Sequence, residues 1–316
     1  MFRLPVSLLA VASLLTVASC SSDSASSSAT NTVTTPTDGP AEGTADHASG
    51  HTYACPMHPE VTSTQAGQKC PKCGMALVHN DQASNGKTYQ MTFAARPRQP
   101  VAGQPVTLTF TPQETGNPAA PVPLDVVHEK KIHLIIVRRD LSVFNHEHPE
   151  YTAQANYQAA FTFPKGGDYV LFQDYTPVGS GHQLGRQALT VGGPKYAPVK
   201  FSQPQMRWQG DGGYQATLAF DKPLKTGQLL AMSITLSQDG QPVTNLENYL
   251  GALGHVVVIS EDSERYLHVH PNEQADHGPR IGFNTSFEQA GLYRVFLQFN
   301  HAGKIHTADF TITVGA

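Results

Sequence analysis

Cysteine is scarce in this sequence: the 316 residues contain four, and the last of them is Cys73. A type 1 copper site needs a cysteine thiolate beside two histidines, so the chain beyond Cys73 is not expected to carry one. Glycine-rich phosphate loops, G-x-S-x-G elbows and H-E-x-x-H motifs are also missing. These gaps argue against an enzyme, and a hydrolytic three-histidine zinc site ranks last among the functional hypotheses.

Long apolar runs are equally rare, and the one that stands out is Leu4–Ala18 near the N-terminus. It is too short to span a bilayer and, after the basic Arg3, it reads as an export signal. The run ends in Leu15-Thr-Val-Ala-Ser-Cys20, which resembles a bacterial lipobox. We therefore predict a lipoprotein signal peptide over residues 1–20 and lipid attachment at Cys20, with an ordinary signal peptide as the alternative.

Residues 21–51 are rich in Ser, Thr and Ala and have almost no large apolar side chains. Such a segment cannot bury enough surface to offset the entropy of ordering, which predicts a disordered linker. The protein is then expected in the cell envelope, lipid-anchored to a membrane outside the cytoplasm. Its formal net charge of −4, with scattered basic residues, argues against nucleic acid as a partner.

Sulfur and imidazole side chains are concentrated in residues 52–80, which we call the N-terminal knuckle. The candidate metal ligands there are Cys55, Met57, His58, Cys70, Cys73 and Met75. Cys70 and Cys73 have the C-x-x-C spacing at which one tight turn directs two thiolates at one ion. This density of soft ligands favours Cu(I) or Zn(II), so the expected cofactor is a copper or zinc ion.

The knuckle resembles the heavy-metal-binding domain of copper- and zinc-transporting P-type ATPases and copper efflux adaptors. The shared pattern is Y-x-C-P-M-H-P-x-V followed by C-P-x-C-G-M-x-L, which this sequence matches from Tyr53 to Leu77. The resemblance implies Cys55, Cys70 and Cys73 as ligands, with His58 and a methionine completing the coordination. It also implies a metal efflux pump component or a metal ATPase as partner. A structural zinc site that only folds the knuckle is the alternative.

The rest of the chain is an internal duplication. Ile132–Val137 matches Gly254–Ile259, and at the same offset Asn145-His-Glu-His-Pro149 matches Leu267-His-Val-His-Pro271. Short runs rich in Val, Ile, Thr, Tyr and Phe alternate with Gly, Pro and Asp-Gly turns. We therefore predict a mainly β protein: a small metal-stapled knuckle followed by two tandem antiparallel β-sandwiches, immunoglobulin-like or cupredoxin-like. Their expected ranges are residues 86–193 and 198–316.

Several strands can be placed from these runs, together with one turn and one short helix. The expected strands are Pro105–Phe110, Ile132–Val137, Tyr169–Phe172, Tyr214–Phe220, Leu229–Leu236, Val256–Ile259, Tyr293–Phe299 and Phe310–Val314. A turn is expected at Asp239-Gly240, and a short helix at Leu246–Leu250.

Each repeat also contains histidines in a repeated pattern. His146 and His148 lie two apart and face one way on a strand, as do His268 and His270. His133 and His255 sit in apolar runs that indicate strands buried on both faces. A fold-back would give one histidine site in each repeat, completed by His182 in the first half and by His301 or His306 in the second. Such sites suit Cu(II), Zn(II) or Ni(II). Alternatively, the histidines are core residues bonded to Asp140, Asp262 and the backbone.

The sequence thus favours an exported, membrane-tethered protein that binds copper, or alternatively zinc, for metal buffering, resistance or delivery to an efflux system. The competing hypothesis is an adhesion or assembly lipoprotein made of β-sandwiches, whose knuckle binds zinc for purely structural reasons.

Overall fold

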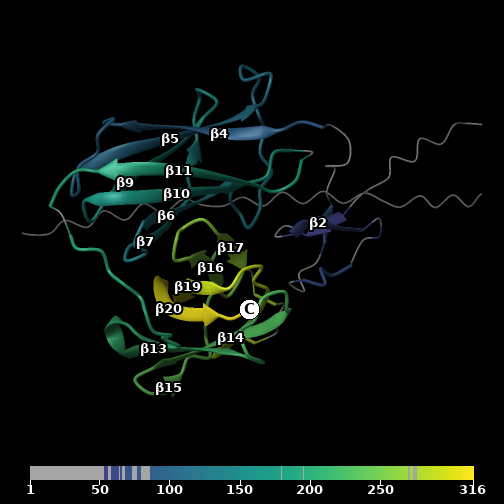
Figure 1. Cartoon of the computed structure of the whole chain (residues 1–316), viewed down its shortest axis with the longest axis vertical. Coiled ribbons are helices and arrows are strands. Elements are labelled where there is room, and N and C mark those ends of the chain that lie inside the picture. The colour runs from purple at the N-terminus through teal and green to yellow at the C-terminus, as the bar shows by residue number, and fades with distance from the viewer. Residues whose placement is uncertain are drawn as a thin grey trace, which may run out of the picture. The chain divides into compact units, whose positions relative to one another are not determined.

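The computed structural model describes most of the chain from Tyr53 to the C-terminus (Figure 1). The described residues are 53–55, 58–63, 65, 68–72, 77–79, 86–178, 180–194, 196–269, 271–272 and 276–316. The predicted signal peptide with Cys20, the linker 21–51, and Met57, Cys73, Met75 and His270 lie outside them. Within this described part, no helix has both the length and the apolar character needed to cross a bilayer.

The N-terminal knuckle contains a small antiparallel sheet with strand order β2-β1-β3. Its strands are β1 (Tyr53–Cys55), β2 (His58–Ser63) and β3 (Val78–His79). Its buried centre consists of Cys55, Cys70 and Leu77, with Tyr53 and Val61 packed against it. A core of this size cannot stabilise a fold alone, so the knuckle needs a further source of stability.

The first sandwich consists of two antiparallel sheets. One sheet has the order β4-β5-β9-β8, made of Tyr89–Arg96, Pro105–Glu114, Tyr157–Thr162 and Glu150–Tyr151. The other has the order β11-β10-β6-β7, made of Gln183–Val191, Gly167–Tyr175, Ile132–Arg138 and Phe144–Glu147. A core that includes Leu108, Phe110, Leu134 and Leu171 fills the space between them.

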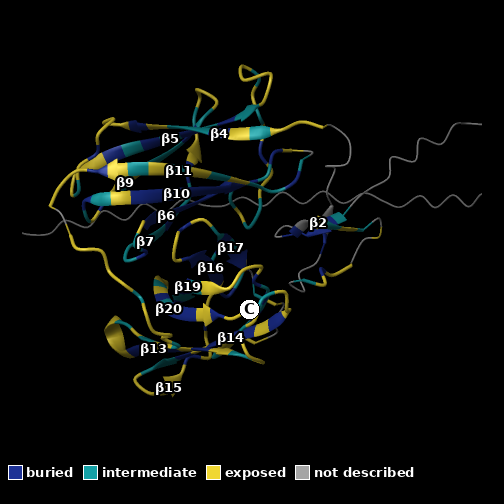
Figure 2. Cartoon of the chain, in the orientation of Figure 1, coloured by how far each residue is buried: buried dark blue, intermediate teal, exposed yellow. Residues whose placement is uncertain are grey.

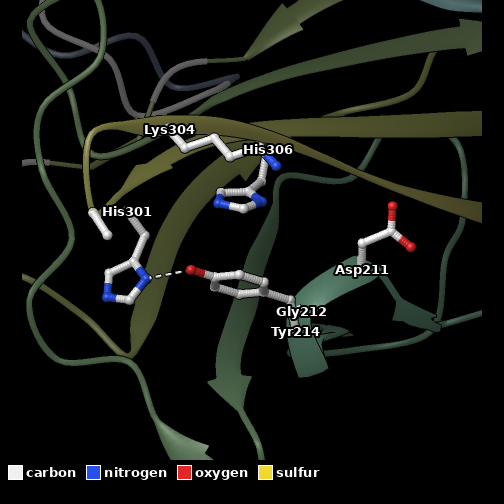
Figure 3. Close-up of a pocket in the computed structure, with 7 residues that line it drawn as sticks. Asp211, Gly212, Tyr214, His301, Lys304 and His306 are labelled. Atoms are coloured by element: carbon white, nitrogen blue, oxygen red, sulfur yellow. Dashed lines mark hydrogen bonds between the residues drawn. The ribbon is translucent and has the colours of Figure 1, made fainter.

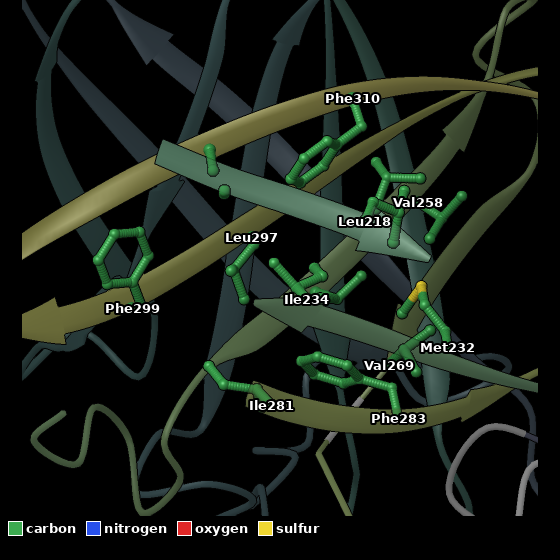
Figure 4. Packing of buried hydrophobic residues seen from close by; sticks show 14 of the residues in the cluster. Leu218, Met232, Ile234, Val258, Val269, Ile281, Phe283, Leu297, Phe299 and Phe310 are labelled. Carbon is green, nitrogen blue, oxygen red and sulfur yellow. The ribbon is translucent and has the colours of Figure 1, made fainter. Parts of the chain in front are cut away.

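The second sandwich repeats this plan. One sheet has the order β12-β13-β14-β15, made of Arg207–Gln209, Tyr214–Phe220, Leu230–Gln238 and Gln241–Pro242, and β18 (Arg280–Thr285) also pairs with β14. The other has the order β17-β16-β19-β20, made of Tyr266–Val269, His255–Ser260, Gly291–His301 and Lys304–Val314. Figure 4 shows the core between these sheets, where Ile234, Phe283 and Phe310 pack together. The predicted pair of tandem antiparallel sandwiches is confirmed.

The predicted strands all occur, most of them longer than expected at one or both ends. The turn at Asp239-Gly240 is also present and joins β14 to β15, with positive φ angles of 49° and 77°. The predicted helix at Leu246–Leu250 is wrong. Its amides bond to distant carbonyls, Leu246 to His277 and Glu247 to Asn300, so the segment runs as an irregular loop along the sandwich.

The two sheets of each sandwich differ in how their faces are buried (Figure 2). β5 and β13 alternate between buried and more exposed residues, as expected for a sheet with one solvent-facing side. β6 and β16 are instead buried at every position. One face of each of these strands packs on its own sandwich core, so something else must cover the other face.

The second face of each of these strands is covered by the opposite repeat. An apolar cluster between the repeats unites Ile135, Val137, Leu141, Val170 and Phe172 of the first with Val257, Ile259, Tyr266 and Phe296 of the second. Two aromatic stacks span it: the ring centroids of Phe144 and Phe296 lie 4.3 Å apart, and those of Phe172 and Tyr266 lie 5.1 Å apart. The sheets containing β6 and β16 therefore pack against each other and join the sandwiches into one body.

An ion pair at the end of β6 secures the segment that connects the sandwiches. Arg138 Nη1 lies 2.6 Å from Asp140, and Arg138 Nη2 donates to the Tyr196 carbonyl at 3.1 Å. The backbone amide of Val199 donates to Asp140 at 2.9 Å. Burial by itself would raise the pKa of Asp140, but the hydrogen bonds from Ser142 and Val199 and the charge of Arg138 lower it.

We expect Asp140→Asn to lower the free energy of unfolding by about 2 kcal/mol at pH 7, because it removes charge-assisted hydrogen bonds to the connecting segment. The folded pKa of Asp140 lies below its unfolded value, so its contribution is present above about pH 4 and is lost as the pH falls through the folded pKa. Urea unfolding at several pH values should show the two proteins converging below about pH 4. The control Asp168→Asn, at an exposed carboxylate that accepts from Thr190, should change little.

A second pair of variants tests the packing between the repeats. Phe172 faces the opposite repeat, whereas its neighbour Leu171 faces its own sandwich core. Changing either residue to Ala should lower the free energy of unfolding by roughly 3–4 kcal/mol. Calorimetry should nevertheless separate them: Leu171→Ala should keep one unfolding transition, and Phe172→Ala should split it into two because the sandwiches lose their coupling. Identical transition shapes for both variants would contradict this packing role.

Candidate metal sites

The first candidate site is built by the β1–β2 hairpin of the knuckle and the loop that follows it. Cys55 ends β1, His58 begins β2, and the two face each other in register after an irregularity between Ala54 and Cys55. Cys70 returns to the same point from the loop. His58 Nδ1 lies 3.6 Å from the Sγ atoms of both Cys55 and Cys70, and all three residues are buried.

These distances fit a shared metal ion. With a Zn–S bond of about 2.3 Å and a Zn–N bond of about 2.0 Å, tetrahedral coordination places sulfur and nitrogen about 3.5 Å apart, close to the distances found here. A single imidazole lone pair cannot accept well from two thiols at once, whereas one ion can hold all three groups. The donor set of two sulfurs and one imidazole therefore suits Zn(II) or Cu(I). The predicted ligands Met57, Cys73 and Met75 lie outside the described residues.

The second candidate site is a group of imidazole rings between the two sandwiches, which we call the histidine cluster. Its members are His128, His133, His146, His148, His255 and His268. Neighbouring rings have centroid separations from 4.6 Å to 6.4 Å. His133 lies on β6, His146 on the paired strand β7, and His148 directly after β7. One ring nitrogen from each of His133, His146 and His148 lies within 4.8 Å of the others, and we call these three residues the triad.

Hydrogen bonds to the rings cross between the repeats in both directions. His146 of the first repeat donates its Nδ1 proton to Gln298 Oε1 of the second at 2.7 Å. His268 of the second repeat bonds through Nδ1 to Asp174 of the first at 3.1 Å. Gln298 lies on β19 opposite His255 of β16. Asp174 lies at the equivalent position on β10, opposite His133 of β6. The interface therefore makes the same contact twice, once in each direction.

The central strands hold their own histidines in matching ways. His133 donates from Nε2 to the Val127 carbonyl at 3.0 Å, and His255 donates from Nε2 to the Tyr249 carbonyl at 2.8 Å. Carbonyl, carboxylate and amide oxygens that fix one ring nitrogen are the usual outer partners of metal-bound histidine.

Burial keeps the triad imidazoles neutral at pH 7. It lowers the pKa of His133 to about 4 and that of His148 to about 3, and neighbouring positive charge adds to both shifts. The pKa of His146 is also lowered well below its usual value, chiefly by burial. Neutral rings retain one lone pair each, which is the form that binds a metal.

Asp174 and His182 form a charged pair beside the cluster. His182 Nε2 lies 2.8 Å from Asp174 Oδ1. Burial alone would raise the pKa of Asp174, but His182 and His268 lower it well below its usual value. Burial opposes protonation of His182, yet the Asp174 carboxylate raises its pKa overall. His182 is therefore the ion-pair partner of Asp174. The sequence-based expectation that it completes the histidine site of the first repeat is not met.

The sequence-based expectation of a separate site in each repeat differs from this structure. The described histidines of both H-x-H motifs meet in one cluster because the sheets that carry them pack on each other. Asp140 and Asp262, the alternative partners, bond elsewhere: Asp140 to Arg138, and Asp262 to Ser260 and Arg265. His270 lies outside the described residues.

His301 and His306, the expected fourth ligands of the second half, line a different pocket with Tyr214 (Figure 3). His301 Nδ1 accepts from the Tyr214 hydroxyl at 2.6 Å, and its Nε2 donates to Asn245 Oδ1 at 3.0 Å. Both ring nitrogens of His301 are therefore used. The ring of His306 stacks on Phe299 at a centroid distance of 5.1 Å. Neither residue completes the histidine cluster.

The sequence analysis missed His128 of the cluster and the two residues that bond to its rings, Asp174 and Gln298. His128 precedes the first matched strand and has the unusual φ of 48°. Asp174 and Gln298 lie at the same place in the two copies of a mostly apolar strand. A polar residue at the same place in both copies of a buried strand is a signal that could have identified them.

Comparison with known proteins gives two family matches. Residues 52–80 match a heavy metal binding domain. Residues 81–190 and 208–316 each match a domain of unknown function, DUF8832. No curated protein matches the chain.

Comparison with solved structures gives matches of low similarity. One is the Yersinia pseudotuberculosis adhesin InvE, at 11% identity and a TM-score of 0.21, over 72% of this chain and 59% of that one. A putative membrane-anchored protein from Corynebacterium diphtheriae gives the same values. A carbohydrate-binding module of the β-sandwich superfamily has 10% identity and a TM-score of 0.23, over 73% of this chain and 98% of that one. This chain thus spans 59% of the length of the first two.

The knuckle match and the Cys55–His58–Cys70 geometry agree that the N-terminal part of the folded chain binds a metal ion. The family model for the sandwiches covers most of the chain, once in each repeat. The chain therefore belongs to the DUF8832 family, with two copies of that domain of unknown function preceded by a heavy metal binding domain.

Proposed function

We propose that this protein binds a transition metal, copper first and zinc second, outside the cytoplasm of a bacterium, facing the periplasm or at the outer membrane. Its role is to buffer the metal, to provide resistance, or to deliver the ion to an efflux system. The observation that carries the proposal is the convergence of the Cys55 and Cys70 sulfurs on one nitrogen of His58 at 3.6 Å. The proposal assigns no catalytic reaction to the chain.

Ligand chemistry supports copper over a purely structural zinc. The knuckle sequence holds Met57 and Met75 next to its three cysteines. Thioethers are ligands for Cu(I), whereas a closed structural zinc site uses cysteine, histidine or carboxylate and has no need of them. With the thiols and His58, they offer Cu(I) a set of soft donors from one short segment.

The proposed location follows from the N-terminal sequence. A lipid on Cys20 would hold the chain at a membrane surface, and residues 21–51 would give the knuckle a reach of roughly 30 Å from it. This position suits exchange of an ion with a membrane-bound efflux component or a metal ATPase, the partner class that we propose. The sandwiches would then serve as a rigid body for docking.

Cu(I) and Zn(II) titrations of the unlipidated chain test the metal assignment. We expect each of Cys55→Ser, Cys70→Ser and Cys73→Ser to weaken Cu(I) binding by about 100-fold or more, because each removes a thiolate from the coordination sphere. A competition assay with a chromophoric Cu(I) chelator under anaerobic conditions measures this loss. Met206→Leu, which removes a partly buried thioether from the second sandwich, is the control and should bind normally.

Two results would contradict the copper assignment. If Cu(I) binding survives all three cysteine substitutions, the knuckle is not its site. If instead only Zn(II) binds, and its removal only unfolds the knuckle, the metal is structural and an adhesion or assembly role for the sandwiches becomes the better explanation.

The membrane anchor has its own test. We expect Cys20→Ser expressed in a bacterial host to leave the detergent phase on Triton X-114 partitioning, because the lipid-bearing thiol is gone. The unmodified sequence should partition into detergent and incorporate labelled fatty acid. A Cys73→Ser chain should partition like the unmodified one, and equal partitioning of the Cys20 variant would show that the anchor does not exist.

A further inference from the structure

We infer that the histidine cluster contains a second metal site, separate from the knuckle, in which His133, His146 and His148 bind one divalent transition ion. Its ligands come from the first sandwich, and one of them is oriented by the second. The chemical class is an ion that prefers imidazole, which means Cu(II), Zn(II) or Ni(II) rather than Cu(I). This inference does not depend on the function proposed for the knuckle.

The main argument is the direction of the protons on His133 and His146. His133 must carry its proton on Nε2, because that atom faces the Val127 carbonyl, which can only accept. His146 carries its proton on Nδ1, where it faces Gln298 Oε1. The two remaining nitrogens, His133 Nδ1 and His146 Nε2, lie 3.1 Å apart, and each presents a lone pair to the other.

Two lone pairs at that distance repel each other unless a positive group lies between them. Both rings are almost fully buried, and a charged imidazolium is costly to place there, so an extra proton is a poor bridge. A metal ion is the better bridge. With metal–nitrogen bonds of about 2.0 Å and tetrahedral angles, two imidazole nitrogens lie about 3.3 Å apart, close to the separation found here.

His148 supplies the third donor. Its Nε2 atom is buried and has no hydrogen-bond partner among the described residues. A buried imidazole nitrogen without a partner costs free energy, and coordination would remove that cost. The ring lies with its centroid 4.6 Å from that of His146 and 5.2 Å from that of His133. Three imidazoles thus converge from β6, from β7 and from the residue directly after β7.

The second repeat contributes the orientation of the site. Gln298, which fixes the His146 ring, lies on β19 of the other sandwich. His268, also from the second repeat, places its ring 5.1 Å from that of His133 and is itself held by Asp174. The ligand geometry therefore exists only when the two sandwiches are packed together. Metal binding and the packing of the repeats should stabilise each other.

One alternative arrangement needs no metal. If the Gln298 amide were reversed, its nitrogen would donate to His146 Nδ1, and His146 Nε2–H would then donate to His133 Nδ1. The current orientation places the Gln298 nitrogen toward Thr307 Oγ1, at 3.5 Å. The two arrangements make opposite predictions: the reversed one gives a satisfied histidine network with no affinity for metal.

The test uses the full chain with Cys55, Cys70 and Cys73 all changed to Ser, so that the knuckle cannot bind. We expect this protein to bind one equivalent of Cu(II), with an EPR spectrum that shows coupling to imidazole nitrogens. Calorimetry should show competition by Zn(II). His146→Gln should weaken this binding by about 100-fold or more, and Gln298→Leu, in the other repeat, by about 10-fold. The control is His301→Gln, outside the cluster, which should bind normally.

Each outcome decides for or against the site. No tight equivalent of Cu(II) or Zn(II) in the triple-serine chain overturns it, as does binding that His146→Gln leaves unchanged. If His146→Gln fails to fold, histidine nitrogen NMR of the metal-free triple-serine chain decides instead. Bare nitrogens at both His133 Nδ1 and His146 Nε2 support the site, and a proton on His146 Nε2 supports the reversed amide. A failure of the knuckle to bind Cu(I) would not affect any of these results, because the chain used here already lacks the knuckle thiols.

Discussion

Polar side chains buried between two apolar sheets need hydrogen-bond partners, and here two histidines find theirs across the interface. His146 meets Gln298 and His268 meets Asp174, each pair joining one repeat to the other. Apolar contacts around Phe172 bring the sheets together, but being non-directional they fix the relative position of the sheets less strictly than hydrogen bonds do. The hydrogen bonds add direction, because a shifted interface would leave buried polar atoms without partners.

Duplication explains why these contacts occur twice, and divergence explains why the two halves differ. Asp174 and Gln298 occupy equivalent positions, yet one is charged and the other is neutral. The carboxylate draws His182 into an ion pair and holds His268 nearby. The neutral amide accepts the Nδ1 proton of His146 and leaves the Nε2 lone pair of that ring facing His133.

Two kinds of donor are kept apart in this chain. The knuckle combines sulfur ligands with one imidazole in a short segment whose own core is too small to fold alone. The free energy of metal binding therefore also supplies the free energy of folding there. The histidine cluster is instead built into a large preformed interface, where strands β6 and β7 fix the rings before any ion arrives. Soft and borderline ions would therefore be sorted by donor type.

The amino-acid sequence by itself determined the β class, the duplication, most strand positions and the thiol-rich knuckle, because these depend on residues close together in the chain. Alternation along Tyr214–Phe220 and the sulfur spacing around Cys70 are local signals. The predicted helix at Leu246–Leu250 failed because its amides bond to carbonyls far away in the sequence, those of His277 and Asn300. Only the tertiary structure decided that the histidines of the two halves form one cluster. The pairing of His146 with Gln298 joins residues 152 positions apart, and no local pattern encodes which faces of two sheets will meet.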